Sequence, residues 1–225
     1  MSMDEKTLQK TQLEIMAKGL VPVFNHDDKD TAYRVIRTCY AAGLRVFEWT
    51  NRGPYAMQLF PDLVKMVRED CQDMLLGVGS LVDERTALRY ASYGIDFMVS
   101  PILDPEMSEM SKKANLVWIP GCGSATEIHQ AQKWGAGLVK VFPGGALGPG
   151  FVKAVLGPMP WSSIMVTGGV STERENLESW FNAGAKCVGI GSKLFTSDLI
   201  IEGKEKELQQ KIAEVLALID DLQKK

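Results

Sequence analysis

Short apolar runs alternate with longer amphipathic segments along the chain. Most of these runs are continuously apolar, which is typical of parallel strands buried on both faces. Eight runs predict strands, at Gly19–Phe24, Arg45–Thr50, Met74–Gly79, Phe97–Ser100, Val117–Pro120, Gly137–Phe142, Ser163–Thr167 and Cys187–Gly191. Three of the intervening segments have the spacing of amphipathic helices: Asp30–Ala42, Pro61–Glu69 and Glu84–Tyr93.

Glycines recur where the helical patterns end. Gly43, Gly94, Gly135 and Gly184 each precede a predicted strand by a few residues. Glycine readily adopts the left-handed conformation that closes a helix. Eight repeated strand–helix units predict an α/β fold, a (β/α)8 TIM barrel. The runner-up is an open doubly wound sheet, but no G-x-G-x-x-G motif follows the first run.

Two terminal helices are expected to flank the barrel. No linker or low-complexity stretch interrupts the series, so we expect one domain over residues 1–225. Its parts are an N-terminal helix (1–18), a barrel core (19–200) and a C-terminal helix (201–225). Thr7–Lys18 is predicted to cap the bottom of the barrel. Lys204–Lys225 has apolar residues at spacings of three and four, and this face is expected to pack on the chain's own barrel.

Composition narrows the class of protein. Of 225 residues, 45% are hydrophobic, which is enough for a large core and excludes a disordered chain. The formal net charge of −3 argues against nonspecific nucleic-acid binding, although it does not exclude a local phosphate site. The N-terminus lacks the apolar region of a secretory signal, and no apolar run approaches the roughly 20 residues that span a bilayer. We therefore expect no membrane partner.

Cysteine and histidine are too few and too scattered for a zinc site. The four cysteines form no C-x-x-C pair, and there are two histidines. No metal is expected, and free cysteines fit a reducing cytoplasm. His26, before a helix, and His129, within one, are more simply explained as a cap residue and an exposed residue. Cys122 at a strand end is more simply a small residue in a turn.

Two charged residues lie inside apolar strands, Glu48 in VFEWTNR and Lys140 in GLVKVFPGG. A lone buried charge costs several kcal/mol unless it is paired or neutralised. One interpretation is an ion pair that only holds the core. The functional interpretation is a reactive amine, because burial lowers the pKa of a lysine and frees it to attack a carbonyl carbon. A nearby carboxylate would transfer protons.

Paired glycines close the last two predicted strands, in VTGGVS (Val166–Ser171) and VGIGSK (Val188–Lys193). Such turns expose backbone N–H groups to an anion, and phosphate sites of barrels commonly follow strands seven and eight. Two ordinary tight turns are the alternative. At other strand ends, Arg52 and Ser80 suit a carboxylate. The turns Val99–Pro101 and Ile119–Ser124 are weaker candidates.

These motifs, taken in order, resemble those of one family. GLVPVF, RVFEWTNR, LLGVGS, FMVSP, WIPGCGS, VKVFPGG, VTGGVS and VGIGS match over roughly Gly19 to Phe195. The chain resembles the 2-keto-3-deoxy-6-phosphogluconate (KDPG) aldolases, also known as 4-hydroxy-2-oxoglutarate (KHG) aldolases. The resemblance implies a TIM barrel, a homotrimer and a class I lyase that needs no metal or other cofactor. Such enzymes serve carbohydrate metabolism in the Entner–Doudoroff pathway.

The resemblance also implies roles for individual residues. Lys140 matches the Schiff-base lysine and Glu48 the general acid/base. A second group matches positions that bind the substrate: Arg52, Ser80, Pro101, Phe142 and Thr167. A third matches the phosphate site: Gly168, Gly169, Gly191 and Ser192. The reaction implied is cleavage of KDPG to pyruvate and glyceraldehyde 3-phosphate, and also of 4-hydroxy-2-oxoglutarate to pyruvate and glyoxylate.

The chain departs from the usual family pattern at a few positions. Ser80 replaces a threonine, Trp49 and Asn51 flank Thr50, and Gly144 stands where alanine is common. These changes bear on substrate specificity, so the substrate could instead be another 2-keto-3-deoxy acid, such as the 6-phosphogalactonate epimer. There are two competing interpretations. One is a phosphate-binding barrel isomerase or epimerase, and the other is a barrel that binds a ligand without catalysis.

Overall fold

Nine parallel strands form one sheet in the computed structural model, which describes residues 3–224. Their order across the sheet is β5-β4-β3-β2-β1-β9-β8-β7-β6. The strands are β1 (Leu20–Phe24), β2 (Val46–Thr50), β3 (Leu75–Gly79), β4 (Phe97–Val99), β5 (Val117–Ile119), β6 (Gly121–Cys122), β7 (Val139–Val141), β8 (Ile164–Thr167) and β9 (Cys187–Ile190).

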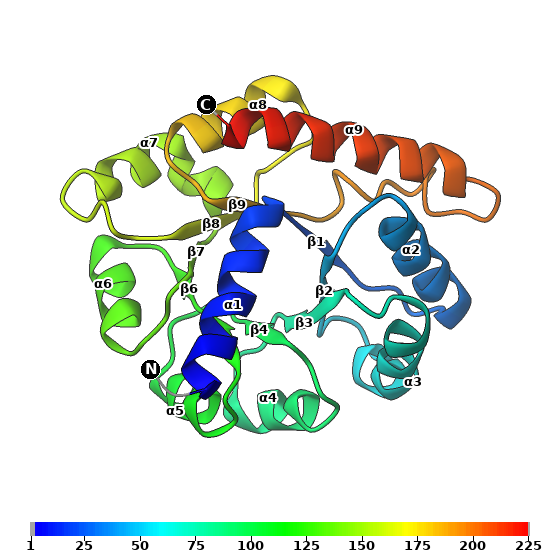
Figure 1. Cartoon of the computed structure of the whole chain (residues 1–225), viewed down its shortest axis with the longest axis horizontal. Coiled ribbons are helices and arrows are strands. Elements are labelled where there is room, and N and C mark those ends of the chain that lie inside the picture. The colour runs from blue at the N-terminus through cyan, green and yellow to red at the C-terminus, as the bar shows by residue number, and fades with distance from the viewer. Residues whose placement is uncertain (1–2, 225) are drawn as a thin grey trace.

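The two edges of this sheet belong to one extended segment, so the sheet curls into a nearly closed barrel (Figure 1). β5 and β6 are separated by Pro120 alone, whose carbonyl oxygen accepts a hydrogen bond from the Lys140 N–H at 2.8 Å. Proline has no N–H for a strand ladder, which accounts for the interruption. The predicted barrel is confirmed, and each of the eight predicted runs contains one strand; β6, directly after the fifth run, is an additional short strand that was not predicted.

Helices surround the sheet, as Figure 1 shows. They are α1 (Met3–Lys18), α2 (Lys29–Ala41), α3 (Ala56–Asp70), α4 (Glu84–Ala91), α5 (Pro105–Lys113), α6 (Ala125–Lys133), α7 (Gly144–Leu156), α8 (Arg174–Asn182) and α9 (Glu205–Gln223). The four glycines that were expected to close helices all have positive φ, between 81° and 101°. They direct the chain from a helix back into the next strand.

The predicted start of α3 was wrong. The sequence predicted that a helix begins at Pro61, whereas α3 begins at Ala56 and contains Pro61. Ala56 and Phe60 are buried against the core. Burial of this extra turn outweighs the hydrogen bond that the proline cannot donate.

Residues of each strand alternate between two cores. An inner cluster fills the barrel, with members that include Val46, Phe97, Leu138 and Met165. The other face of the strands packs against the surrounding helices, as do Phe47 and Val139. This period-two alternation places every second residue inside the barrel.

The two terminal helices pack against different parts of the barrel. α1 crosses the barrel opening in the view of Figure 1, and its Ile15 is fully buried in the inner cluster. α9 packs against α2 and α8 and buries an apolar face that includes Ile212 and Ile219. Packing of this face on the chain's own barrel is therefore confirmed. Met1, Ser2 and Lys225, which complete the predicted terminal segments, lie outside the described residues.

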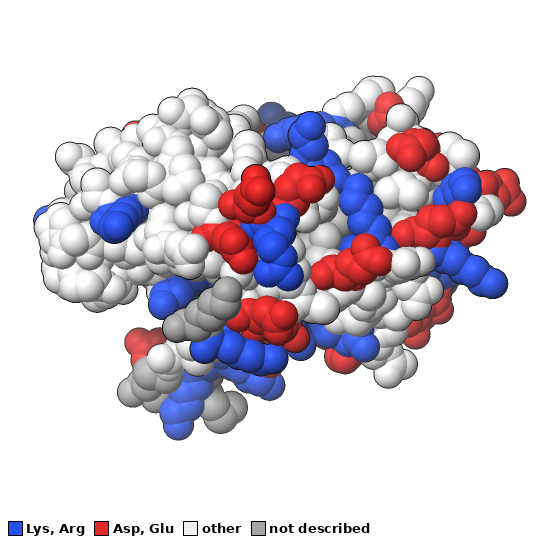
Figure 2. All heavy atoms as spheres, turned by 90° about the horizontal axis from the view of Figure 1, so that it is seen from above, with Lys and Arg blue, Asp and Glu red and all other residues white. Residues whose placement is uncertain are grey.

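Charge is dispersed over the surface that carries α9. Figure 2 shows basic and acidic side chains side by side on this face, with no broad area of one sign. That distribution agrees with the small net charge of −3. Within the described part of the chain, no helix has the length and apolar character needed to cross a membrane.

Candidate active site

Glu48 and Lys140 point into the barrel from β2 and β7. They lie on the inner face because they alternate with residues that pack outward, such as Phe47 and Val139. The residues are 2% and 4% exposed, respectively. The Lys140 Nζ lies 4.9 Å from the centroid of the Phe142 ring. The structure thus brings an amine and a carboxyl group together in the barrel interior, whereas the strand pattern predicted only that both are buried.

Burial shifts the pKa values of both groups toward their neutral forms. The pKa of Lys140 is lowered, mainly by loss of hydration, with the Glu48 charge opposing and the Arg52 charge adding to the shift. The pKa of Glu48 is raised, again mainly by burial, while Lys140 and Arg52 oppose the shift. A neutral amine beside a protonated carboxylic acid is a nucleophile beside a proton donor.

The Glu48 carboxyl group occupies space left by a glycine. A Cβ atom at Gly79 would overlap with Glu48 Oε1, so the third strand must carry glycine there for the carboxyl group to keep its place. Glu48 Oε2 is buried and has no hydrogen-bond partner, and the same holds for the Thr167 hydroxyl. An unsatisfied buried polar atom costs about 1–3 kcal/mol, which favours a ligand that supplies the missing bonds.

Arg52 follows β2 at the mouth of the barrel. Its Nε donates a hydrogen bond to Ser80 Oγ at 3.0 Å, so the two residues expected to bind a carboxylate are in direct contact. Ser80 follows β3 with a φ of 61°, a conformation that few residues other than glycine adopt. Such backbone strain is commonly retained at functional sites. Pro101 follows β4 and packs against Gly121. It does not line either of the two hollows at the barrel mouth that are described below.

The glycine turns after β8 and β9 line one hollow of about 430 Å³, together with Arg52, Phe142 and Thr167. Gly168 and Gly169 have φ of 85° and 75°, so their backbone is in the left-handed region. The Gly168 carbonyl oxygen accepts a hydrogen bond at 2.7 Å from the Gly145 N–H at the start of α7. This contact holds the turn in place, and Gly191 and Ser192 line the same hollow.

Gly144, the first residue of α7, packs tightly at the same place. A Cβ atom there would come within 2.6 Å of Val166 Cγ1 and 2.7 Å of the Gly168 carbonyl oxygen. α7 therefore begins closer to the glycine turn than a side chain would allow.

A second hollow, of about 320 Å³, continues from the first across β1 and β2. The two share Val23, Arg52, Gly191 and Ser192. The residues that line them include Arg52, Lys193 and His26 but no Asp or Glu. In a chain with net charge −3, a mouth lined by basic groups without carboxylates favours an anionic ligand.

Asn25 and Lys193, at the mouth, were not among the sequence-based candidates, and His26, which the sequence analysis explained as a cap residue, also lies there. Lys193 directly follows the VGIGS turn, and this adjacency was the available signal. Asn25 and His26 follow β1, and only the barrel geometry brings them beside Arg52. His129 is exposed on α6, as expected. Cys122 is buried, and burial raises the pKa of its thiol to about 12, which disfavours the reactive thiolate.

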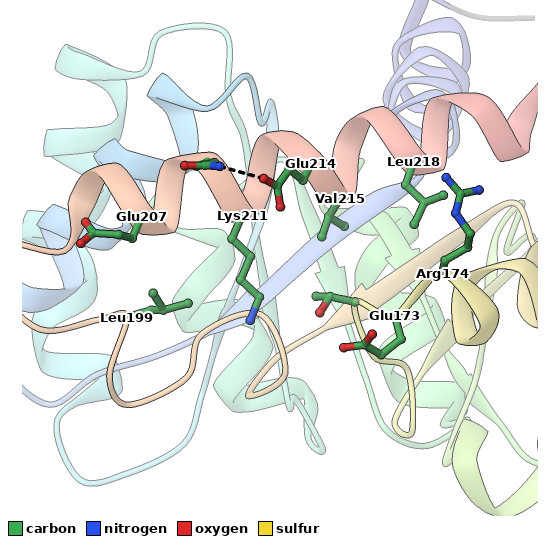
Figure 3. Close-up of a pocket in the computed structure, with 10 residues that line it drawn as sticks. Glu173, Arg174, Leu199, Glu207, Lys211, Glu214, Val215 and Leu218 are labelled. Atoms are coloured by element: carbon green, nitrogen blue, oxygen red, sulfur yellow. Dashed lines mark hydrogen bonds between the residues drawn. The ribbon is translucent and has the colours of Figure 1, made fainter.

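A larger hollow of about 590 Å³ lies away from these residues, between α9 and the segment that leads into α8 (Figure 3). Its lining mixes Glu207 and Glu214 with Lys211 and Arg174. Lys211 extends from α9 and donates a hydrogen bond at 3.1 Å to the Lys193 carbonyl oxygen. This hydrogen bond ties α9 to the residue that follows the Gly191–Ser192 turn. Residues 3–224 contain no cluster of three His, Cys, Asp or Glu side chains that could hold a metal ion.

Comparison with known proteins gives a consistent result. The sequence profile of the KDPG and KHG aldolase family matches residues 12–213. The 2-dehydro-3-deoxy-6-phosphogalactonate aldolase of Escherichia coli K12 is 28% identical over 95% of this chain and 98% of its own length. The 2-dehydro-3-deoxy-phosphogluconate aldolase of Haemophilus influenzae is 29% identical with the same coverage.

Solved structures share the fold. A KDPG aldolase of Legionella pneumophila, crystallised with pyruvate as a covalent carbinolamine intermediate, superposes with a TM-score of 0.75 at 23% identity. The match covers 92% of this chain and 96% of that one.

Proposed function

This chain belongs to the KDPG and KHG aldolase family and is a class I aldolase, a carbon–carbon lyase, and we propose that it cleaves KDPG to pyruvate and glyceraldehyde 3-phosphate. It would also cleave 4-hydroxy-2-oxoglutarate to pyruvate and glyoxylate. The observation that carries this proposal is the buried pair of Lys140 and Glu48, whose pKa values are shifted in opposite directions by burial. A buried ion pair that only stabilised the core would need hydrogen bonds to both carboxylate oxygens, yet Glu48 Oε2 has none.

Imine formation begins with the neutral Lys140 amine. Its Nζ attacks C2 of the 2-keto acid, and a proton moves from the attacking nitrogen to the former carbonyl oxygen to give a neutral carbinolamine. Glu48, as the neutral acid, protonates the C2 hydroxyl, which leaves as water. The product is an iminium ion that withdraws electrons from C3.

Cleavage uses the same carboxyl group in its ionised form. Glu48 accepts the proton of the C4 hydroxyl, the C3–C4 bond breaks, and the aldehyde leaves. The electron pair of that bond forms an enamine on Lys140. Glu48 then returns its proton to C3. Water adds to the resulting iminium ion while Glu48 takes one of its protons, and collapse of the carbinolamine releases pyruvate and restores the neutral amine. One carboxyl group thus alternates between acid and base and ends in its starting protonated form.

The mouth carries two basic side chains, Arg52 and Lys193, which suit the two anionic groups of KDPG. Arg52, in contact with Ser80, is proposed to bind the carboxylate, since a guanidinium group suits that shape. Backbone N–H groups of Gly168, Gly169, Gly191 and Ser192 are proposed to bind the phosphate, assisted by Lys193 in the same lining. Phe142 and Thr167, which line the same hollow, would lie beside the imine. Pro101 is kept as a proposed substrate-binding residue on the family motif alone.

The test is reductive trapping. Borohydride with pyruvate is expected to add a single pyruvyl group to Lys140, located by peptide mass mapping, and Lys140→Met should abolish the adduct. Lys153 on exposed α7 offers a matched control, because Lys153→Met should leave trapping unchanged. A folded wild-type protein that forms no adduct would overturn the proposal and leave a phosphate-binding isomerase or epimerase as the better candidate.

Substrate choice and metal independence are tested separately. The curated relatives include both phosphogluconate and phosphogalactonate enzymes, so the two C4 epimers should be compared by kcat/KM. Activity is expected to survive exhaustive treatment with EDTA, since the proposed chemistry uses no metal. Loss of activity on chelation, restored by added metal, would contradict a Schiff-base mechanism without a cofactor.

We also propose a cytoplasmic homotrimer. Three exposed apolar residues follow the ends of adjacent strands: Tyr55 after β2, Val82 after β3 and Ile102 after β4. Exposed apolar residues at neighbouring positions favour a protein interface. Light scattering should give the mass of three chains, and Val82→Asp with Ile102→Asp should reduce it. Free, buried cysteines favour a reducing compartment.

A further inference from the structure

Asn25 joins the end of β1 to the end of β2 through both atoms of its amide. Its Oδ1 accepts a hydrogen bond from the Thr50 hydroxyl at 2.8 Å, and its Nδ2 donates one to the Arg52 carbonyl oxygen at 2.9 Å. Thr50 is 2% exposed, so this hydroxyl has little access to solvent. The Asn25 side chain therefore holds both Thr50 and Arg52, one through its amide oxygen and the other through its amide N–H.

The same short segment is bound from the other side as well. The Asn51 N–H donates to the Gly79 carbonyl oxygen at 2.9 Å, and the Arg52 N–H donates to the Thr50 carbonyl oxygen at 2.8 Å. The Arg52 side chain then reaches Ser80. The backbone of Arg52 is thus held toward β1 by Asn25, while its guanidinium group is held toward β3.

This arrangement matters because Arg52 itself is exposed and follows the last residue of its strand. A long exposed side chain loses considerable rotamer freedom when it binds a ligand in one orientation. A bidentate contact to a carboxylate also depends on the angle at which the guanidinium group is presented. Fixing the backbone from which the side chain extends reduces that entropic cost before the ligand arrives.

We propose that Asn25 is a positioning residue that presents Arg52 to the carboxylate of the 2-keto acid. This inference rests on the proposed function, in which Arg52 binds that carboxylate. Asn25 itself does not act on the reacting atoms; its hydrogen bond to the Arg52 carbonyl oxygen sets the starting point of the arginine side chain. Loss of that bond should weaken binding of pyruvate and leave the chemistry of Lys140 largely intact.

The experiment measures the pyruvate concentration that half-saturates borohydride trapping of Lys140. Asn25→Leu removes both hydrogen bonds, and Asn25→Asp, when ionised, keeps the acceptor for Thr50 but has no donor for the Arg52 carbonyl oxygen. Both are expected to raise the half-saturating concentration by about tenfold and to change the saturating rate by less than about twofold. In an Arg52→Ala background, Asn25→Leu should add less than about twofold, because a residue that acts through Arg52 loses its effect there.

Gln132→Met is the matched control. This substitution removes the hydrogen bond of 2.8 Å that the Gln132 amide donates to Ser162 Oγ. Ser162 precedes β8, at the end of the barrel opposite the mouth. The substitution should lower the melting temperature and leave half-saturation unchanged. If Asn25→Leu fails to fold, Asn25→Asp carries the comparison.

The outcomes distinguish failure of the positioning role from failure of the proposed function. Wild-type half-saturation in Asn25→Asp, or equal effects of Asn25→Leu with and without Arg52, would overturn the positioning role alone. Absence of any adduct in the wild-type protein would overturn the proposed function and this inference with it.

Discussion

Gly79→Ala tests whether the position of the Glu48 carboxyl group controls the reaction. The added Cβ would overlap with Glu48 Oε1 and come within 2.9 Å of Glu48 Cγ, so the carboxyl group must move. Gly79 does not have a positive φ, so the substitution adds bulk without backbone strain. The variant therefore isolates one steric contact at the proposed acid/base.

The magnitude follows from the displacement. A shift of about 1 Å at a catalytic group commonly costs about a hundredfold in rate. Added bulk in a packed core costs about 1–3 kcal/mol in stability, which lowers the melting temperature of a chain this size by about 2–12 °C. We therefore expect kcat for KDPG cleavage to fall by about a hundredfold, with a fold that remains intact at 25 °C.

The assay couples released pyruvate to lactate dehydrogenase and pairs the kinetics with thermal unfolding. Gly150→Ala on α7 is the matched control, because nothing lies within 4 Å of the added Cβ, and it should leave both kcat and KM unchanged. A Gly79→Ala enzyme with wild-type kcat and a lowered melting temperature would refute the reasoning, since the carboxyl group would then have moved without consequence.

Three further predictions concern charge and the phosphate end. The Glu48 charge raises the pKa of Lys140, so Glu48→Gln should lower that pKa further and move the midpoint of pH-dependent pyruvate trapping to lower pH; a move to higher pH would contradict the electrostatic account. Lys193→Met should raise KM for KDPG about three- to tenfold and leave KM for unphosphorylated 4-hydroxy-2-oxoglutarate unchanged, whereas equal effects on both would exclude a phosphate contact. Gly169→Ala places a Cβ against Gly145 at a φ of 75°, so it should lower the melting temperature and raise KM for KDPG while pyruvate trapping persists.

Much of the fold could be predicted because the signals are local. Continuous apolar runs mark strands buried on both faces, and glycines after helices mark the return of the chain to the sheet. The start of α3 could not be predicted from Pro61, because the preceding turn is stabilised by packing of Phe60 against residues far along the chain. The interruption at Pro120 left the order of strands intact.

The residues of the candidate site likewise fall into those that the sequence could predict and those that it could not. A charged residue inside an apolar strand stands out from its neighbours in the sequence, so Glu48 and Lys140 could be singled out from the strand pattern alone. Asn25 and His26 could not, because nothing about an Asn-His pair that precedes a helix indicates which strands lie beside it. Lys193 lies between these cases, since it adjoins a recognisable glycine motif but its proximity to Arg52 depends on barrel closure.

By itself, the sequence determined that this chain forms a parallel barrel with a lysine and a glutamate on buried strands, because hydrophobic periodicity and the cost of burying charge act on each strand separately. Only the tertiary structure decided that the two groups share one interior, that Gly79 leaves room for the carboxyl group, and that Asn25 holds Arg52. These relations join β1, β2, β3 and β7, and contacts between segments so far apart in the chain exist only once the sheet has curled and brought the carboxyl ends of its strands to one mouth.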